Sequence, residues 1–448
     1  MADYTGTANA TTFSGKQFAV YVAEDDTVGV FNTSTNGDEF QRVDVEGMTL
    51  PTFTPNQEFE MRSGSGRMAE FGAMFSSSKG VETEFTLSGR LDLGSLPIFA
   101  ENVLALTGGL INTITLPAGG YEPANISHNA AVGEDDWHLS LSVYFQSPSS
   151  GNSDSYKLSG CVCTNLSLTA DMGTASGRYD YSATFKTGYK PAKGVASMSA
   201  ATAINATNIF LSDQSFKSLE IHDVDDDFVV GGGAYNNDPT ITHTASTAIQ
   251  VGQSVTGTGI PALAYVASIT SDTVFELSAS TTGGEQTGED LTFISNYTSI
   301  NPMFNSIGLT FDSPTVFLGA QGDNAEPEVI ARAVPELGIT MSGSLKYDSE
   351  TDKLLEAHRD PSQTSYMQFY IGNKTPTTLP GAGAVFGQDI ALGVHNDTTL
   401  QWLFHKAKLI SASVGSGDVA SIDFEAKILD PAAATFEILH LTVGDSVA

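Results

Sequence analysis

Two seven-residue segments of this chain share one pattern, 254 positions apart. Phe85–Leu91 reads FTLSGRL and Ile339–Leu345 reads ITMSGSL, so Thr86 corresponds to Thr340 (340 − 86 = 254). In both segments apolar and polar side chains alternate, as expected for a β-strand with one buried face. A β-rich module that occurs twice predicts two homologous domains, an arrangement typical of proteins that build symmetric or nearly symmetric assemblies.

Similar segments precede and follow the shared pattern in both copies. Phe40–Pro51 and Phe304–Pro314 are alternating runs that end at a proline. After the pattern we expect one short helix in each copy. The first covers Ser95–Leu106 with Ser95 as its N-cap residue, and the second covers Ser349–His358 with an acidic first turn.

Each copy then closes with a predicted pair of strands. Tyr179–Phe185 and Ile422–Ile428 keep Asp and Ala in register, and the alternating runs Leu166–Leu168 and Lys408–Ile410 precede them. This ordered agreement predicts homologous domains over residues 1–200 and 201–448. The alternative is that Thr-, Ser- and Gly-rich alternation, common to all-β proteins, produces weak self-similarity by itself.

Composition indicates a β-dominated protein. The chain has 448 residues, 44 of them glycine, and no long amphipathic pattern. We therefore predict an all-β dominated fold with minor α structure. It consists of two tandem β-sandwich or barrel domains, each flanked by a short helix, and a small inserted β domain.

The chain is strongly acidic. Its 20 basic and 52 acidic residues give a formal net charge of −32. Such a chain does not hold nucleic acid by neutralising phosphates, which requires clustered Lys and Arg. An acidic wall could instead keep a polyanion from adhering. The alternative is that the acidity serves only solubility or reflects a saline habitat.

Cysteine usage gives no sign of a disulfide framework. Cys161 and Cys163 are the only cysteines. In a strand both point to one face, where residues two apart cannot form an unstrained disulfide. We therefore expect two buried or half-buried thiols in a reducing compartment. The first residues lack a secretory pattern, and no apolar stretch predicts a membrane span.

The second copy carries an insertion. Residues 236–296 contain no Lys or Arg and include the phrase VGQSVTGTGIP, followed by two further strand-like runs. This segment predicts a compact β module of three strands on a loop, and it resembles small β repeats of phage virion proteins. Decoration is the expected role, with carbohydrate or host-surface binding as the alternative. Just before it, Gly231–Gly233 is interpreted as a flexible turn.

Candidate catalytic or metal-binding residues do not form a recognisable motif. Asp223, Asp225, Asp226 and Asp227 could contribute calcium ligands, but their spacing does not match an EF-hand and an acidic hairpin tip is favoured. Glu134–Asp136 is interpreted in the same way. The eight histidines lack metal-binding spacing, and no nucleophile elbow or phosphate loop occurs. We predict neither an enzyme nor a cofactor or metal.

The loop Met61–Lys79 is the strongest candidate interaction site. It is long, lies between two predicted strands, and corresponds to Gly319–Pro335 of the second copy. One interpretation is a hairpin folded over its own core. The other is an arm that reaches an acidic neighbouring subunit and docks by burying Phe and pairing Arg with carboxylates. The residues of this contact would be Arg62, Arg67, Met68, Phe71, Met74, Phe75 and Lys79.

Taken together, these elements resemble the tail tube (major tail) proteins of long-tailed phages. The domain of that family is a β-sandwich or barrel with a short helix and a long loop that contacts the next ring. The resemblance covers both halves outside the insertion. It rests on architecture, duplication and the virion-type module rather than on a diagnostic motif.

The resemblance implies a structural virion protein assembled in the host cytoplasm. Members with two fused copies form trimeric rings with pseudo-sixfold symmetry, which stack into a tube. The implied partners are further copies of the chain and the tape measure, tail terminator and distal tail proteins, with DNA passing an acidic lumen without specific binding. No membrane is involved. Two alternatives are another virion component, such as a tail-tip, baseplate or decoration protein, and a secreted carbohydrate-binding β protein.

Overall fold

The computed structural model of the chain is rich in strands and describes most of the two copies. Strands make up 64% of the described residues and one helix occurs among them, which confirms the predicted all-β fold with minor α structure. The described residues are 17–32, 40–51, 56–59, 74–77, 82–91, 95–104, 113–117, 126–127, 139–148, 154–171, 179–196, 218–222, 228–249, 253, 255–261, 264–293, 298–300, 304–319, 327–332, 338–348, 351–352, 354–355, 366–372, 400–416, 420–429 and 437–443.

In the first copy, one long strand belongs to two sheets. The strands are β1 (Ala19–Glu24), β2 (Gln41–Val43), β3 (Gly47–Met48), β6 (Thr83–Arg90), β9 (Leu141–Gln146), β10 (Tyr156–Asp171) and β11 (Tyr179–Thr187). The first half of β10 continues the sheet β2–β1–β9, and its second half continues the sheet β3–β6–β11. A bulge between Cys163 and Asn165 separates the halves, and bulges bend strands. The two sheets thereby enclose one core.

The second copy repeats this plan. Its strands are β13 (Ser218–His222), β20 (Thr298–Ile300), β21 (Phe304–Asp312), β24 (Gly338–Lys346), β25 (Tyr366–Gly372), β26 (Leu400–Ser416) and β27 (Ala420–Ile428). The long strand β26 joins the sheet β20–β13–β25 to the sheet β21–β24–β27. Each strand therefore has a counterpart at the same place in the first copy, although the domain limits at residues 200 and 201 remain a prediction.

Strand registers coincide where the repeated sequence pattern lies. Gly47 of β3 pairs with Ser88 of β6, and Gly308 of β21 pairs with Ser342 of β24. A Cβ added to Gly47 would lie 2.7 Å from the Ser88 Oγ, and one added to Gly308 would lie 2.9 Å from the Ser342 Oγ. The same serine packs over the same glycine in both copies, which explains why both positions lack a side chain.

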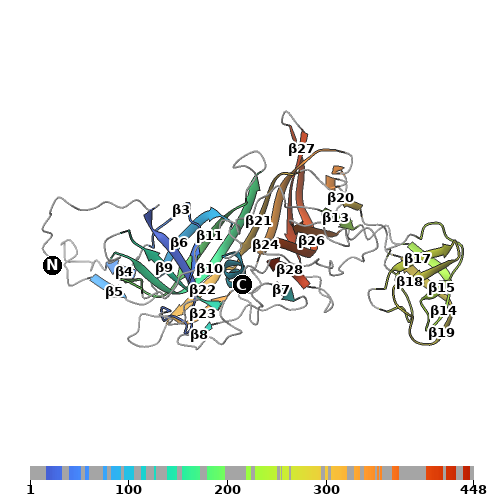
Figure 1. Ribbon diagram of the computed structural model, residues 1–448, viewed down its shortest axis with the longest axis horizontal. Coiled ribbons are helices and arrows are strands. Elements are labelled where there is room, and N and C mark those ends of the chain that lie inside the picture. The colour runs from blue at the N-terminus through green and yellow to red at the C-terminus, as the bar shows by residue number, and fades with distance from the viewer. Residues whose placement is uncertain are drawn as a thin grey trace, which may run out of the picture.

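The two copies are joined edge to edge. β10 of the first copy pairs antiparallel with β21 of the second, from Asn165–Asp312 to Asp171–Ser306. The result is one continuous sheet of eight strands in the order β3–β6–β11–β10–β21–β24–β27–β26, whose members stand side by side in Figure 1. The core-facing residues of both copies form one apolar cluster under this sheet.

Other strands connect the copies or stand apart from the main sheets. β7 (Thr113–Pro117) of the first copy pairs with β28 (Glu437–Val443), which in turn pairs with β26. β22 (Thr315–Gly319) and β23 (Pro327–Arg332) form a hairpin that pairs with β8 (Ile126–Ser127). β4 (Asn56–Phe59) and β5 (Met74–Ser77) form a separate hairpin, and β12 (Ala192–Lys193) pairs with the start of β10.

The first predicted helix is present as α1 (Leu96–Leu104), and Ser95 precedes it as expected. In the second copy a helical turn follows Asp348. The Asp348 carboxylate accepts a hydrogen bond from the Thr351 backbone N–H, and the Thr351 hydroxyl accepts one from the Asp348 N–H. These reciprocal bonds are those of a capping box with Asp348 as the N-cap. Of the predicted segment Ser349–His358 only Thr351, Asp352, Leu354 and Leu355 are described, so its limits remain a prediction.

The inserted module forms a sheet of its own with its own core, at the right of Figure 1. Its six strands are β14 (Phe228–Asn236), β15 (Thr240–Thr242), β16 (Val255–Thr256), β17 (Val266–Ser271), β18 (Val274–Leu277) and β19 (Glu285–Phe293). The sheet begins before residue 236 and has more strands than the three predicted. Gly231–Gly233 lies within β14, so the flexible-turn interpretation was wrong. Gly232 has a φ of +75° beside a register shift, and glycine suits such a bulge.

Candidate subunit interface

The junction between the copies is packed like the interior of a domain. On the core side, Leu168 and Ala170 of β10 are 2% and 4% exposed. Leu309 of β21 is also buried. On the opposite face the hydroxyls of Ser167 and Thr310 lie 3.4 Å apart. We refer to the β10–β21 pairing as the internal junction.

At the far end of the sheet, β26 is the counterpart of β10, but its outer edge is open. No described strand pairs with that edge over Lys408–Ser416. Ala412 of β26 pairs with β27 at the position where Leu168 of β10 pairs with β11, so Ala412 is the counterpart of Leu168. By the same comparison Val414 is the counterpart of Ala170. Ala412 is only half-buried and Val414 is 51% exposed. The residues that the internal junction buries are therefore uncovered at this edge, which we call the β26 edge.

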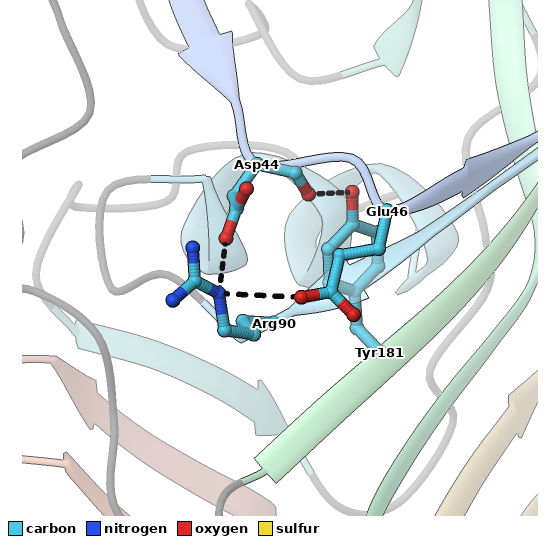
Figure 2. A network of polar contacts seen from close by, with 4 residues as sticks. All are labelled: Asp44, Glu46, Arg90 and Tyr181. Carbon is cyan, nitrogen blue, oxygen red and sulfur yellow. Dashed lines mark hydrogen bonds and ion pairs between the residues drawn. The ribbon is translucent and has the colours of Figure 1, made fainter. Parts of the chain in front are cut away.

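At the other end, β3 is the counterpart of β21 and also has an open edge, because in the described part it pairs only with β6. A polar network holds the chain that leads into β3, as Figure 2 shows. The Arg90 Nε lies 2.7 Å from the Asp44 carboxylate and 3.7 Å from that of Glu46, and the Tyr181 hydroxyl donates to the Asp44 carbonyl oxygen. Gly89 permits this approach, because a Cβ there would collide with the same carbonyl. We call this the β3 edge.

Apolar residues are also incompletely covered at the β3 edge. Met48 pairs with β6 at the position where Leu309 pairs with β24, so Met48 is the counterpart of Leu309. Leu50, two residues further on, corresponds to Phe311. Met48 and Leu50 are half-buried and pack against the main core, whereas Leu309 and Phe311 are 4% and 0% exposed. Both ends of the sheet thus lack the partner that the internal junction supplies.

The predicted contact arm is partly described. Met74 and Phe75 lie on β5, where their backbones pair with Phe59 and Glu58 of β4. Among described residues β4 and β5 pair only with each other, and we call them the arm hairpin. The remaining predicted contact residues lie outside the described residues: Arg62, Arg67, Met68, Phe71 and Lys79. Their role as an inter-ring contact remains a prediction.

The counterpart of the arm hairpin was not recognised as a contact from the sequence, yet it docks onto the first copy. This docked hairpin, β22–β23, follows β21 as the arm hairpin follows β3. Ile330 is fully buried in a cluster with Val28, Leu139, Val162 and Tyr189 of the first copy. Val329 and Ile330 also pair with the backbone of β8.

Arg332, at the end of the docked hairpin, binds the first copy through its guanidinium group. One terminal nitrogen donates to the Cys163 carbonyl oxygen at 3.0 Å, and the other donates to the Asn102 carbonyl oxygen at 2.7 Å. The side chain is 4% exposed. Hydrogen bonds from a charged donor in a buried setting are stronger than neutral ones, so this contact fixes the hairpin against β10 and α1. Only its positive charge could have drawn attention to it in the sequence.

The remaining candidates for chemistry are only partly described. Asp223 to Asp227 and Glu134 to Asp136 lie outside the described residues, and the described residues contain no group of three His, Cys, Asp or Glu side chains suited to a metal ion. Cys161 and Cys163 are free and buried, which confirms the prediction of two core thiols. Burial raises the pKa of the Cys163 thiol to about 12, so it stays protonated and unreactive.

Asp25 is a buried carboxyl group that sequence reasoning did not single out. It accepts hydrogen bonds from the hydroxyls of Ser140 and Ser142 and from the Gly160 backbone N–H. Loss of hydration on burial raises its pKa from 3.8 to about 6, and these hydrogen bonds oppose the rise. The group ties the end of β1 to β9 and β10. Its role is therefore structural, within the core of the first copy.

No family model and no curated protein matches this chain. Among described residues, no helix is long and apolar enough to cross a membrane. The most informative comparison is the one inside the chain, where each copy shows what the other does with the same strands.

Proposed function

We propose that this protein is the structural subunit of a phage tail tube. Chains join head to tail through their sheet edges into a ring, and rings stack into a hollow tube for DNA. The observation that carries the proposal is the internal junction. One chain already contains the contact that two chains need, and it leaves the matching edges, β3 and β26, open at opposite ends of one sheet.

The two open edges correspond to the two strands that pair at the internal junction. If β26 of one chain takes the place of β10, and β3 of the next takes the place of β21, Ser413 lies opposite Gly47 as Thr169 lies opposite Gly308. Met48 then becomes buried, as Leu309 is, and Val414 takes the place of the buried Ala170, facing Glu46 where Ala170 faces Ile307. Pairing also removes exposed edges, which otherwise template aggregation. Such a contact joins two different surfaces and produces either a closed ring or an open helical filament.

Strand counting supports a wide channel. Each chain contributes eight strands to the sheet, so three chains give about 24 strands, spaced about 4.8 Å apart. The circumference is then about 115 Å and the diameter about 37 Å, before strand tilt widens it. Barrels of 16–18 strands already leave an aqueous channel. A ring of three chains, with pseudo-sixfold symmetry from the duplication, therefore has room for a lumen.

The solvent-facing side of the sheet suits a channel wall for a polyanion. A row of hydroxyls crosses five strands in register: Ser88, Ser182, Ser167, Thr310 and Thr340. Carboxylates such as Asp180, Asp312 and Asp423 share this face, and the row itself continues into the exposed Lys427 and Lys408. Hydroxyls and carboxylates do not hold phosphates as fixed cations do, so over the five strands of the row DNA slides past. The other implied partners are the tape measure, tail terminator and distal tail proteins, in the virion tail.

Electron microscopy of the purified protein tests the proposal. We expect hollow filaments or rings with threefold symmetry and pseudo-sixfold density. Discrete particles that do not stack would favour a tail-tip, baseplate or decoration protein. A true sixfold ring with one domain per lobe would contradict the arrangement of the two copies proposed above. A specific, strong signal in a glycan-binding or hydrolysis screen would favour the carbohydrate-binding alternative.

A further inference from the structure

The arm hairpin and the docked hairpin occupy the same place in their copies. Both follow a proline after counterpart strands, Pro51 after β3 and Pro314 after β21, and both precede counterpart strands β6 and β24. The registers of these flanking strands coincide. The two hairpins are therefore equivalent elements, and what one binds is evidence for what the other binds.

The docked hairpin crosses to the copy that pairs with its own strand. β21 pairs with β10, and the hairpin that follows β21 lies on β8, β10 and α1 of that same first copy. Its contact is close: a Cβ added to Gly188 of the first copy would lie 2.9 Å from the Phe317 ring and from Pro327. Strand pairing and hairpin docking are thus two parts of one contact between copies.

The arm hairpin has no such copy within its own chain. It follows β3, the outermost strand of the sheet, whose open edge faces away from β6. In Figure 1 β4 and β5 lie at the left, whereas β26 and β28 lie near the middle of the picture, beyond β10 and β21. A copy that pairs with the β3 edge must come from another chain.

We propose that the arm hairpin of one chain docks sideways onto the second copy of the neighbouring chain in the same ring. This inference rests on the proposed function and gives the arm a lateral contact in place of an inter-ring one. The occupied face is the counterpart of the one that Arg332 binds. It comprises β26 around Ala407 and the helical turn around Leu354. Ala407 is the counterpart of Cys163, because Ala407 pairs with Ile428 as Cys163 pairs with Phe185.

Site-specific photo-crosslinking tests the docking. Benzoylphenylalanine replaces Phe75 of the arm hairpin in one sample and Phe317 of the docked hairpin in a matched control, so both changes exchange one aromatic residue for another. Isotopically heavy and light chains are mixed before assembly, so that crosslinks between chains carry both labels. Mass spectrometry then locates the crosslinked peptides.

We expect Phe75 to crosslink between chains to the second copy, near Ala407 or Leu354, and this product to be lost on dilution below the assembly threshold. The probe at Phe317 should crosslink within one chain to the first copy near Gly188, at every concentration. Assembled chains whose Phe75 probe reaches a first copy, an inserted module or its own chain would overturn the lateral docking and leave the tube intact. Chains that never associate would overturn the tube, and the docking with it.

Discussion

Replacing Val414 with aspartate should abolish assembly and leave the fold of the single chain intact. Val414 is 51% exposed on the β26 edge, so a charge there remains hydrated in the monomer. Its counterpart at the internal junction, Ala170, is 4% exposed. In the proposed ring the valine becomes buried, and an aspartate at that place must either lose its hydration or take up a proton.

The structure sets the size of this effect. Burying the exposed half of a valine contributes about 1 kcal/mol, taken from about 1.5–3 kcal/mol for a fully buried one. Protonating an aspartate of pKa about 3.9 at pH 7 costs about 4 kcal/mol, at about 1.36 kcal/mol per pH unit. Each contact between chains therefore weakens by about 5 kcal/mol, more than a thousandfold in the association constant.

Sedimentation of Val414→Asp over a range of concentrations measures the threshold for assembly, and thermal unfolding of the dilute protein checks the fold. Val229→Asp is the matched control, because Val229 is 60% exposed on the inserted module, away from the proposed contact. We expect the control to assemble like the unaltered protein. If both variants assemble at the same threshold, the β26 edge is not buried between chains and the reasoning fails.

Three further predictions concern stability. Arg332→Ala should lower the free energy of unfolding by about 3–5 kcal/mol, because buried carbonyl groups lose a charged donor. The urea midpoint of unfolding should fall accordingly. The control Arg42→Ala, at an exposed position, should leave that midpoint unchanged. Gly308→Ala should cost about 1–3 kcal/mol through contact with the Ser342 hydroxyl, and adding Ser342→Ala should recover most of that loss in the same measurement. Asp25 has a folded pKa of about 6, above its unfolded 3.8, so its contribution to stability is complete below pH 4 and is lost as pH rises to about 6. Relative to Asp25→Asn, the unaltered protein should lose about 3 kcal/mol across that window in pH-dependent unfolding, and parallel curves would show that the carboxyl is not buried as described.

Local patterns were sufficient to predict the strands of the repeat. The alternation of Phe85–Leu91 places every second residue in the core, and a register shift by one would expose them all, so sequence and structure agree closely there. The docking of β22–β23 was not predictable in the same way. Arg332 binds two carbonyl oxygens that lie 169 and 230 positions away in the sequence. No local sequence pattern predicts which distant carbonyl oxygens a guanidinium group contacts. The interpretation of Gly231–Gly233 as a flexible turn was wrong for a different reason, because glycine suits both a turn and a strand bulge.

The two open edges differ in a way that favours pairing of unlike ends. The β3 edge is short, Asp44 and Glu46 precede it in the chain, and Arg90 of β6 contacts both carboxylates. Short strands and charged residues discourage an edge from pairing with a copy of itself. The β26 edge is longer, and its side chains from Ser411 to Ser416 are uncharged. If two β3 edges met, they would bring like clusters together, whereas a β3 edge on a β26 edge repeats a contact that the chain already makes inside itself. A short edge beside charged residues at one end and a longer edge at the other therefore favour the proposed head-to-tail pairing, and we expect the curvature of the sheet to decide how many chains close the proposed ring.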